Sequence, residues 1–590
     1  MAKWLLKQNK VNTASMSEAL GISETAAVIL ANRGIGTVKK GRTFLDCPIA
    51  DMPDPYLFKD MQKGIEIIAR AVKNKSKITI YGDYDVDGVM SITILLKALN
   101  TLGADVDYYV PHRQKEGYGL NADAVKKIYE NGTKLLLTCD NGIAAVNEIK
   151  LAKGLGLKTV IIDHHEPGFV TDSDGNAAEI LPDADAVIDH KQKDCTYPYK
   201  NLCAAGISYK FAKALYEYMG RAFDINDELL IFAAIATVCD IVDLIDENRV
   251  IVKNGLRLIN GKIDNIGLKA IISAAGLTKD SITEYHFGFI IGPSVNSSGR
   301  LESAAEAVEL FNEQSPGKAA ELAQTLVSLN TVRKNMTEEA AKNIISSIES
   351  GSLKNDRVLV VYDHSAHESV AGIVASRIKE RFNKPVIVIT DSGDLAKGSA
   401  RSIDGYNIFE ALNKNRSLFV KFGGHAMAAG LSLEKDNIEV LRQRLNSDCP
   451  ITDDMLEKKL RIERKMDFKD INLDLAKELK SLSPFGKGNP KPLFGSLNLN
   501  VDRVQLIGKN RSIVKLTVSD ESGKSFYAVG FDIYEKYLYD IKHLYGEDVC
   551  CKILNGECVS HKTDMVYTID INSFNSRETV QLIIQDIRLK

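Results

Sequence analysis

Residues 77–88 read KITIYGDYDVDG, and this stretch decides the fold of the first half of the chain. It opens with a short run of β-branched and aromatic residues that ends at Gly82, a pattern typical of a buried strand. Three aspartates follow within five residues: Asp83, Asp85 and Asp87. A helical pattern then runs from Gly88 to Gly103. A strand, an acidic turn and a helix in this order predict the start of a βαβ unit.

The same alternation continues along the chain. Short apolar runs lie at residues 105–110, 134–140 and 159–163, with a glycine two to seven residues after each. A second α/β segment has apolar runs at 357–363 and 385–391 with a helix from about Val370 between them. Strands that alternate with helices indicate mostly parallel sheets, and such sheets bind ligands at the carboxyl ends of their strands.

The remaining segments are of two kinds. Residues 200–275 and 318–350 have helical patterns, and the second of these is long enough to be a connector. From about residue 490, β-rich runs dominate, at 493–501, 512–518, 525–531, 566–572 and 580–587. These runs predict a small β-barrel with one inserted helix near residues 534–545.

We therefore expect an α/β protein with a parallel-sheet domain, a smaller α/β domain, a long helix that joins them, and a C-terminal β-barrel. The predicted boundaries are an N-terminal segment over 1–50, the parallel-sheet domain over 51–317, the connector helix over 318–350, the smaller α/β domain over 351–450 and the barrel over 451–590.

The composition is that of a folded globular chain. In 590 residues there are 75 Lys+Arg and 78 Asp+Glu, a net charge of −3, and 45% of the residues are hydrophobic. These values disfavour a disordered or fibrous protein. No apolar run reaches the roughly 18 residues of a membrane-spanning helix, and the N-terminus lacks the apolar core of a secretory signal. The nine cysteines form no CxxC pair, so we expect reduced thiols and a cytoplasmic protein.

Acidic residues recur where predicted strands end. Asp140 ends LLLTCD, and Asp163 ends VIID and runs directly into His164 and His165. Asp240 closes the apolar run IFAAIATVCD. One acidic loop alone is often only a solvated surface, but packing does not explain this recurrence or the two adjacent histidines.

The clustered side chains predict a metal centre. Carboxylates and imidazole without a set of cysteine ligands favour Mn²⁺ or Mg²⁺, and Cys139 is expected to face the core because it precedes Asp140 in a strand. Two such ions could activate a water molecule and hold a phosphoryl group during its displacement.

Four motifs in this order, DYDVDG, TCDNG, DHH and VCDIVDL, resemble the metal motifs of the DHH phosphoesterase superfamily. Downstream, HESVAGIVASRIKERFNKPVIVIT, GSARSIDGYNIFEAL and KFGGHAMAAG resemble the DHH-associated domain. PFGKGNPKPLF and the β-rich segment after it are similar to the oligonucleotide-binding (OB-fold) domain of the RecJ exonuclease family. YYVPHRQKEGYGL and IGPSVNSSGR resemble the same family, and the likeness covers nearly the whole chain from about residue 45.

The resemblance implies roles for the clustered residues. Asp83, Asp85 and Asp140 would hold one metal ion. The other would be held by Asp87, Asp140, His164 and Asp240, so that Asp140 bridges the pair. His165 would face the scissile phosphate, and Asp163 would orient the imidazoles.

The resemblance also implies a substrate site. Arg300, in what we expect to be a loop, would contact phosphate, although a surface arginine is the simpler reading of the residue alone. Arg113, Ser399 and Arg401 would bind a 5′ phosphate, because a guanidinium fork and a hydroxyl suit that group. The glycines around His425, which include Gly424, would let backbone approach a nucleotide, or they would serve only tight packing.

Features of the predicted barrel are weaker signals for nucleic acid. Phe526, Tyr527 and Phe531 could stack on bases, but core packing explains them equally well. Basic residues near the start of the barrel could follow a phosphate backbone: Lys487, Lys491, Arg503, Lys509 and Arg511.

The function that the resemblance implies is a metal-dependent exonuclease in DNA repair and recombination. It would degrade single-stranded DNA from the 5′ end and release 5′-mononucleotides. The alternatives are a phosphodiesterase for short oligonucleotides or cyclic dinucleotides and a non-catalytic DNA-binding scaffold. The family suggests a single-strand-binding protein and a RecQ-type helicase as partners of a monomer that does not associate with membranes.

Overall fold

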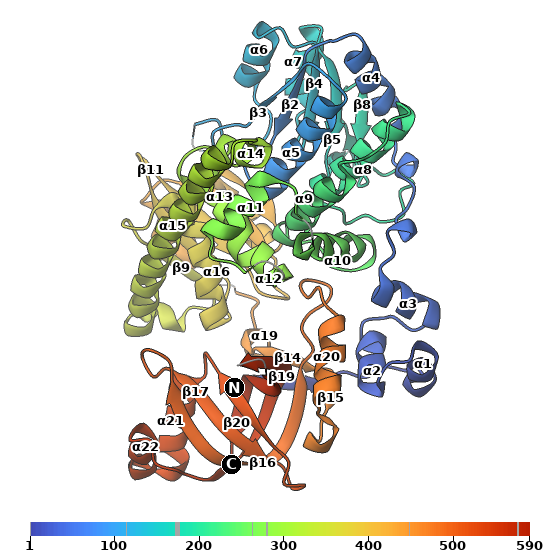
Figure 1. Cartoon of the computed structure of the whole chain (residues 1–590). Helices are drawn as coiled ribbons and strands as arrows, with labels where there is room; N and C mark the ends of the chain where they lie inside the picture. Colours follow the sequence, from blue (N-terminus) through green and yellow to red (C-terminus); the bar gives the residue numbers. More distant parts are fainter. Residues whose placement is uncertain are drawn as a thin grey trace. The chain divides into compact units, whose positions relative to one another are not determined.

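The computed structural model describes residues 2–113, 115–171, 177–261, 263–278, 281–447, 449–574 and 577–590 (Figure 1). The chain divides into two compact units. The first unit comprises Pro55–Asp240 and Leu258–Lys458, and the second comprises Ala2–Asp54, Ile241–Arg257 and Lys459–Lys590.

The first unit contains the predicted parallel sheet. Its five strands have the order β3-β2-β4-β5-β8, with β2 at Ile78–Gly82, β3 at Val106–Tyr109, β4 at Leu135–Cys139, β5 at Lys158–Ile162 and β8 at Ala186–Ile188. Strand β8 is not apparent in the sequence pattern because it has only three residues. The central strands β2 and β4 are buried throughout, as expected for a sheet that is covered on both faces.

Helices cover both faces of this sheet. Tyr81 and Leu136 share one core cluster with α6 (Ala122–Glu130) and α7 (Val146–Gly154). On the other face, a Cβ at Gly82 would lie 2.5 Å from Ile92 of α5 (Val86–Thr101), so the helix packs directly on the backbone of β2. Helix α5 starts two residues earlier than the sequence predicts, because Asp85 caps it. Helix α4 (Met61–Lys73) and the hairpin β6–β7 (Gly168–Thr171, Ala177–Ile180) complete this part.

The two predicted helical regions are confirmed. The region at 200–275 contains α8 (Ala204–Tyr218), α9 (Asn226–Cys239), α10 (Asp246–Asn260) and α11 (Ile266–Ala274), and the long connector is α15 (Pro316–Ser350). Between them lie helices that the sequence pattern did not predict: α12 (Glu284–His286), a π-helix (Phe287–Ile291), α13 (Gly292–Leu301) and α14 (Ala305–Asn312). In the part of the chain that the structure describes, no helix is long and apolar enough to cross a membrane.

One local prediction is wrong: Arg300 lies in the last turn of α13 and not in a loop. The serines before it do not break the helix because their hydroxyls bond back to helix carbonyls. Ser297 Oγ donates to Ser294 O at 2.7 Å, and Ser298 Oγ donates to Val295 O at 2.8 Å. Serine side chains that are satisfied in this way are tolerated inside a helix.

The second predicted α/β segment is confirmed, but its sheet is mixed and has one parallel strand pair. Its order is β12-β13-β11-β10-β9, with β9 at Leu359–Tyr362, β10 at Val386–Ser392, β11 at Leu395–Arg401, β12 at Phe419–His425 and β13 at Ala428–Leu433. Strand β10 is parallel to β9 and antiparallel to β11. Three helices accompany the sheet, α16 (Ala371–Phe382), α17 (Ile408–Asn413) and α18 (Asn437–Ser447), and α15 packs against α16.

The second unit contains the predicted barrel. Strand β16 pairs with both β17 and β19, which closes the ring β16-β17-β18-β20-β19. The strands span Phe494–Ile507 (β16), Ile513–Ser519 (β17), Ser525–Gly530 (β18), His561–Phe574 (β19) and Arg577–Leu589 (β20). Two helices are inserted instead of the predicted one, α21 (Tyr534–Tyr545) and α22 (Glu547–Leu554), because Gly546 with φ +91° interrupts the helical run.

Segments from three parts of the sequence share the core of this unit. Helices α1 (Thr13–Leu20), α2 (Glu24–Asn32) and α3 (Val38–Asp46) pack with α20 (Leu473–Ser481) and the barrel strands. Strand β1 (Lys3–Leu6) pairs with β14 (Lys459–Ile462). Arg249 of the 241–257 segment is 1% exposed; it lies 3.6 Å from the Phe44 ring centroid and donates to Ser483 O. A chain cut before the barrel would leave these apolar side chains without their partners.

The turn after β2 generates a prediction. A Cβ at Gly88 would lie 2.3 Å from Asp83 O, so Gly88→Ala must displace the acidic turn. We expect the free energy of unfolding to fall by about 1–3 kcal/mol, the usual cost of overpacking. The control is Gly154→Ala at the end of α7, where nothing lies within 4 Å of the added Cβ. Equal stability of the two variants in denaturant titrations would contradict this account.

Candidate metal centre and phosphate-binding pocket

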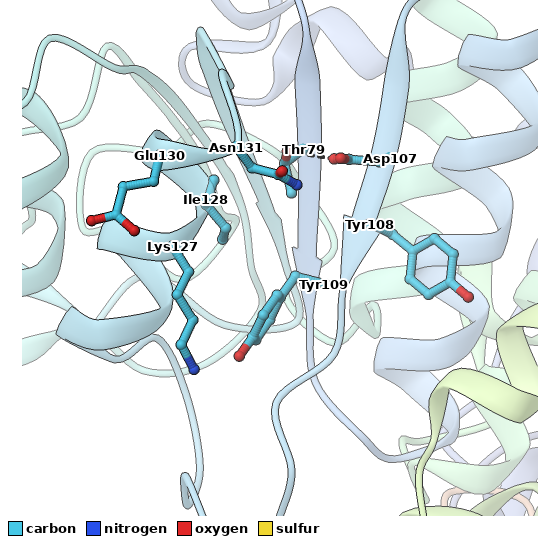
Figure 2. Close-up of a pocket in the computed structure, with 8 residues that line it drawn as sticks. All are labelled: Thr79, Asp107, Tyr108, Tyr109, Lys127, Ile128, Glu130 and Asn131. Atoms are coloured by element: carbon cyan, nitrogen blue, oxygen red, sulfur yellow. Dashed lines mark hydrogen bonds between the residues drawn. The ribbon is translucent and has the colours of Figure 1, made fainter.

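A cavity of about 380 Å³ lies beside the edge strand β3. Its lining residues are Thr79, Asp107, Tyr108, Tyr109, Lys127, Ile128, Glu130 and Asn131, and Figure 2 shows Tyr108 and Tyr109 on opposite sides of β3. None of these eight residues is one of the predicted site residues, so this cavity is separate from the predicted metal centre.

The predicted acidic residues meet at the carboxyl edge of the parallel sheet. Asp83, Asp140 and Asp163 each follow directly on a strand, β2, β4 and β5. Asp140 has φ +60°, a left-handed conformation that aspartate tolerates better than most residues. Asp85 caps α5, where its Oδ1 accepts hydrogen bonds from the N–H groups of Asp87 and Gly88. The caps and strand ends therefore bring the carboxylates to one place.

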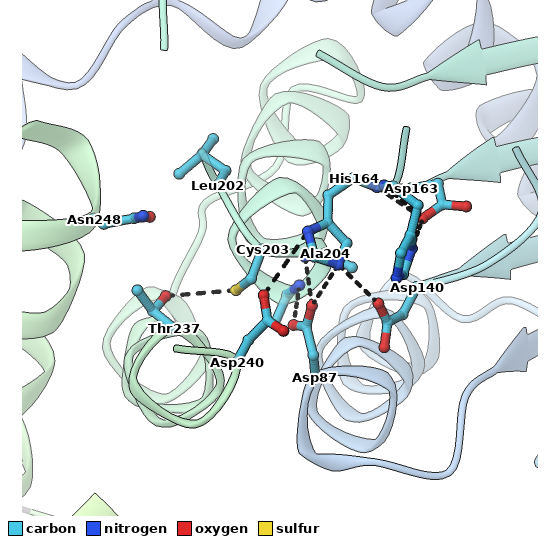
Figure 3. Close-up of polar contacts among 12 residues, drawn as sticks. Asp87, Asp140, Asp163, His164, Leu202, Cys203, Ala204, Thr237, Asp240 and Asn248 are labelled. Atoms are coloured by element: carbon cyan, nitrogen blue, oxygen red, sulfur yellow. Dashed lines mark hydrogen bonds and ion pairs between the residues drawn. The ribbon is translucent and has the colours of Figure 1, made fainter. Parts of the chain in front are cut away.

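His164 lies at the centre of the cluster (Figure 3). Its Nε2 is 3.2 Å from Asp140 Oδ1 and 3.6 Å from Asp87 Oδ2, and its Nδ1 is 3.8 Å from Asp240 Oδ2. Asp240 comes from a different element, since it is the C-cap of α9. The structure thus brings together residues that lie more than 150 positions apart in the sequence.

Asp87 is held by the N-terminus of α8. The backbone N–H groups of Ala204 and Ala205 donate to its two carboxylate oxygens at 2.7 and 2.8 Å. The first N–H groups of a helix have no partner within the helix, and they favour negative charge. These donors were missed by sequence reasoning, because a backbone group in NLCAAG carries no side-chain signal.

The carboxylates are electrostatically costly in this arrangement. Burial and the neighbouring Asp85 raise the pKa of Asp83 to about 8. The pKa of Asp140 is raised as well, by burial and by repulsion from Asp87 and the other aspartates. Among the described residues, Asp83 Oδ1 has no hydrogen-bond partner although it is buried. A cation would relieve this repulsion and satisfy the orphaned oxygen.

Two groups of ligand atoms, each within 4.8 Å of one another, could hold such a cation: Asp83, Asp85 and Asp140 form one, and Asp87, His164 and Asp240 the other. A third group overlaps them and consists of Asp140, His164 and His165. Oxygen ligands with one or two imidazoles suit Mn²⁺ or Mg²⁺. The donor set therefore fits the predicted metals.

Asp163 contacts the second histidine. Its Oδ1 accepts from His165 Nδ1 at 2.7 Å, and its Oδ2 accepts from Ile143 N at 2.9 Å. Burial would lower the pKa of His165, but the hydrogen bond and charge of Asp163 outweigh it and raise the pKa to about 9. Tyr118 Oη lies 3.1 Å from His165 Nε2, a contact that sequence reasoning did not identify.

A second cavity, of about 230 Å³, collects basic residues from both α/β segments of the unit. The predicted residues Arg113, Arg300, Ser399 and Arg401 all line it, together with Glu368, Ser369, Ala371, Gly372, Ile373, Lys397, Gly398 and Gly430. Three of the lining residues, Ala371, Gly372 and Ile373, form the first turn of α16. The N–H of Ala371 donates to Glu368 O, and the positive end of the helix dipole at this turn favours an anion.

Hydrogen bonds and one cation–π contact hold the arginine side chains of this pocket in place. Ser399 and Arg401 lie two residues apart on β11 and therefore on the same face of the sheet, and Arg401 Nη1 donates to Ser399 Oγ at 3.2 Å. A Cβ at Gly372 would lie 2.9 Å from Arg401 Nη2 and 3.0 Å from Ser399 Oγ, so the glycine lets both side chains lie against the start of α16. Arg300 Nη1 donates to Ser369 O at 2.8 Å, and Arg113 lies 5.0 Å from the Tyr84 ring centroid.

Gly424 and His425 do not line this pocket. Both lie on β12 and are exposed, with His425 opposite Ala428 in the register. Of the neighbouring glycines, Gly430 reaches the pocket.

The barrel residues divide into core and surface. Phe526 is partly buried and packs against the core of the second unit. Tyr527 and Phe531 are exposed, and Lys515 Nζ lies 4.4 Å from the Tyr527 ring centroid. Lys487 and Lys491 form ion pairs with Asp243 and Asp570.

Three family models match the chain in the predicted order. The N-terminal domain of the DHH family matches residues 77–237, the DHHA1 domain matches 355–449 and the RecJ OB domain matches 462–586. The single-stranded-DNA-specific exonuclease RecJ of Bacillus subtilis (strain 168) is 38% identical over 583 residues, which are 98% of this chain and 69% of the relative. The chain belongs to the RecJ family.

Solved structures agree with this assignment. RecJ from Thermus thermophilus, in complex with Mn²⁺, has a TM-score of 0.81 at 23% identity and covers 99% of this chain and 79% of that one. An exonuclease RecJ bound to manganese has a TM-score of 0.58 at 28% identity and covers 68% of this chain and 96% of that one. These RecJ structures contain the kind of metal that the donor set predicts.

The raised carboxyl pKa generates a prediction about pH. Because the folded pKa of Asp83, about 8, lies above its ordinary 3.8, the metal-free protein is more stable with this group protonated. Its contribution is present at low pH and is lost as pH rises from about 4 to 8. Mn²⁺ needs the ionised carboxylates, so the rise in Tm on adding saturating Mn²⁺ should be larger at about pH 8 than at about pH 6. A rise that does not depend on pH would contradict the assignment.

Proposed function

We propose that this protein is an exonuclease that degrades single-stranded DNA from the 5′ end and releases 5′-mononucleotides. The observation that carries the proposal is the presence, in one compact unit, of an Asp/His metal centre and a pocket lined by arginines and Ser399. The metal centre fits hydrolysis of a phosphodiester bond, and the pocket fits a terminal phosphate.

The proposed metal ligands are the two groups described above. Asp83, Asp85 and Asp140 would hold one ion, and Asp87, Asp140, His164 and Asp240 the other. When bound, Mn²⁺ or Mg²⁺ supplies Lewis-acid stabilisation of the phosphoryl group and a water molecule of lowered pKa.

His165 is the proposed contact to the scissile phosphate. Asp163 holds its Nδ1–H, so Nε2 is directed away from Asp163 toward Tyr118. The hydrogen bond and charge of Asp163 raise the pKa of this imidazole, which favours the cationic form that can donate to an anionic oxygen. Arg300 would add a second positive charge from the end of α13.

The pocket supports the 5′ polarity and the size of the product. Arg401, Ser399 and the first turn of α16 offer charged and neutral donors that together suit a phosphate monoester. A terminal phosphate in this pocket would place the next phosphodiester toward the metal centre, because Arg113 and Arg300 lie on that side, near Tyr84 and Asp85. One nucleotide would be released in each cycle.

The barrel favours DNA strands over the alternative of short oligonucleotides or cyclic dinucleotides, because OB folds that bind single strands cover about 4–16 nucleotides. The intact ligand set disfavours a non-catalytic scaffold. The proposal includes a cytoplasmic monomer that works with a single-strand-binding protein and a RecQ-type helicase, for which family membership is the support.

Asp140→Asn tests the metal centre. We expect more than about a 100-fold loss of cleavage with Mn²⁺, since even outer-shell partners of metal ligands contribute 10- to 100-fold. The metal-free variant should melt no lower than wild type, because a buried repulsive charge is gone. The matched control is Asp107→Asn on β3, whose carboxylate pairs with Lys77 at 3.0 Å. Near-normal turnover by Asp140→Asn would refute the ligand assignment.

Arg401→Ala tests the terminal-phosphate pocket. Losing one charge-assisted contact costs about 1.5–3 kcal/mol, or roughly a 10- to 150-fold lower kcat/KM on 5′-phosphorylated strands. Strands with a 5′ hydroxyl should be affected much less, and Arg401→Lys should restore only part of the loss. The control is Arg444→Ala on the exposed side of α18. An equal loss on both 5′ ends would mean that Arg401 does not bind the terminal phosphate.

A further inference from the structure

Two aromatic side chains in the first unit are exposed and stacked on each other. Tyr285 and Phe289 are 58% and 64% exposed, and their ring centroids lie 4.9 Å apart with an interplanar angle of 20°. Tyr285 belongs to α12, and Phe289 belongs to the π-helix that continues it. Large apolar rings that remain exposed in a paired arrangement are typical of binding surfaces.

The backbone between these two rings is hydrogen-bonded to the residue that precedes Asp240 of the candidate metal centre. Phe287, between the two rings in sequence, is buried, and its carbonyl accepts from Cys239 Sγ at 3.3 Å. Cys239 is the last residue of α9, and the next residue, Asp240, is a metal-centre carboxylate. A π-helical turn in an otherwise α-helical run is frequent at functional sites, and here it turns Phe287 inward and leaves Phe289 outside.

The same continuous helical run leads to the phosphate pocket. Helix α13 starts one residue after the π-helix, and Arg300 in its last turn lines the pocket. Eleven residues separate Phe289 from Arg300 in the sequence, or about 16 Å at a rise of 1.5 Å per residue. At about 3.4 Å for each stacked nucleotide, this length corresponds to no more than about five nucleotides.

We propose that Tyr285 and Phe289 form a stacking platform for bases of single-stranded DNA on the 3′ side of the scissile bond, within about five nucleotides of the 5′ end. The inference rests on the proposed function and adds a base-binding surface to it. With the terminal phosphate beside Arg300, a strand that passes the metal centre continues toward the α9–π-helix junction. Stacking accepts every base, so the platform holds the strand without reading its sequence.

The test uses the full chain with a 5′-phosphorylated dinucleotide and a strand of about twelve nucleotides. The double variant Tyr285→Leu/Phe289→Leu keeps apolar bulk and removes both π-faces. We expect its kcat/KM on the long strand to fall about 5- to 150-fold, the range for losing one stacked base, mainly through a higher KM. The dinucleotide, too short to reach the platform, should be cut as by wild type. Phe289→Trp should retain the long-strand activity.

The matched control is Tyr218→Leu. Tyr218 is also an exposed aromatic residue, but it is the last residue of α8. The first residue of this 15-residue helix donates to Asp87, so Tyr218 lies about 20 Å from Asp87 along the helix. Unchanged kcat/KM of the double variant on the long strand would overturn the platform, as would an equal loss on both substrates or a change of oligomeric state. A wild-type protein that cuts neither substrate would instead refute the proposed function.

A second measurement reports stacking directly. Strands with 2-aminopurine at single positions, bound to the Asp140→Asn protein so that they are not cut, should show quenched fluorescence within the first five positions. Adding the two leucine substitutions to this protein should remove the quenching there. Quenching that persists would place the stacking surface elsewhere and overturn the proposal.

Discussion

The repulsion between buried carboxylates at one edge of a parallel sheet is the constraint on which the rest of the first unit depends. Asp83, Asp140 and Asp163 arrive at this edge because parallel strands end on the same side. The fold supplies compensation from several directions: the N-terminus of α8 binds Asp87, and His164 stands between the carboxylates. What remains uncompensated, such as Asp83 Oδ1, is the part that a cation would neutralise.

The proposed phosphate pocket is lined mainly by positive charges, in contrast to the acidic cluster, and it is likewise built from several distant segments. It gathers guanidinium groups from the first sheet domain and from the mixed sheet, and it adds the first turn of α16. Arg300 lies close to charged groups of both the pocket and the acidic cluster. Burial and the nearby Arg113 lower its pKa to about 10, whereas the carboxylate of Asp85 raises it. An anionic strand would complement the pocket at its terminus and would meet the carboxylates only through cations. The proposed substrate pocket and the candidate metal centre are therefore complementary in charge to different parts of the same ligand.

The second unit depends on contacts between segments that lie far apart in the sequence. Its barrel closes through β16, its core includes side chains of the N-terminal helices, and the 241–257 segment is attached to it by Arg249. Arg249, stacked on Phe44 and bonded to the carbonyl of Ser483, ties these pieces to one another. The 241–257 segment begins directly after the metal-centre residue Asp240. The unit that contains the RecJ OB domain is therefore continuous in sequence with Asp240 of the candidate metal centre, and residues 2–54 are part of its structure.

The sequence by itself determined the elements and the chemical types of the site. Period-two and helical patterns predicted the sheets, the long helix and the barrel, and aspartates at strand ends predicted a metal centre, because these signals are local. Tertiary structure alone decided which distant groups complete the site. The N–H groups of Ala204 and Ala205, the contact of Tyr118 with His165 and the first turn of α16 depend on how helices pack, and no local pattern encodes that. Arg300 illustrates the same limit, because the sequence predicts a loop there. In the structure the hydroxyls of Ser297 and Ser298 donate to helix carbonyls, and Arg300 lines the pocket from the last turn of α13.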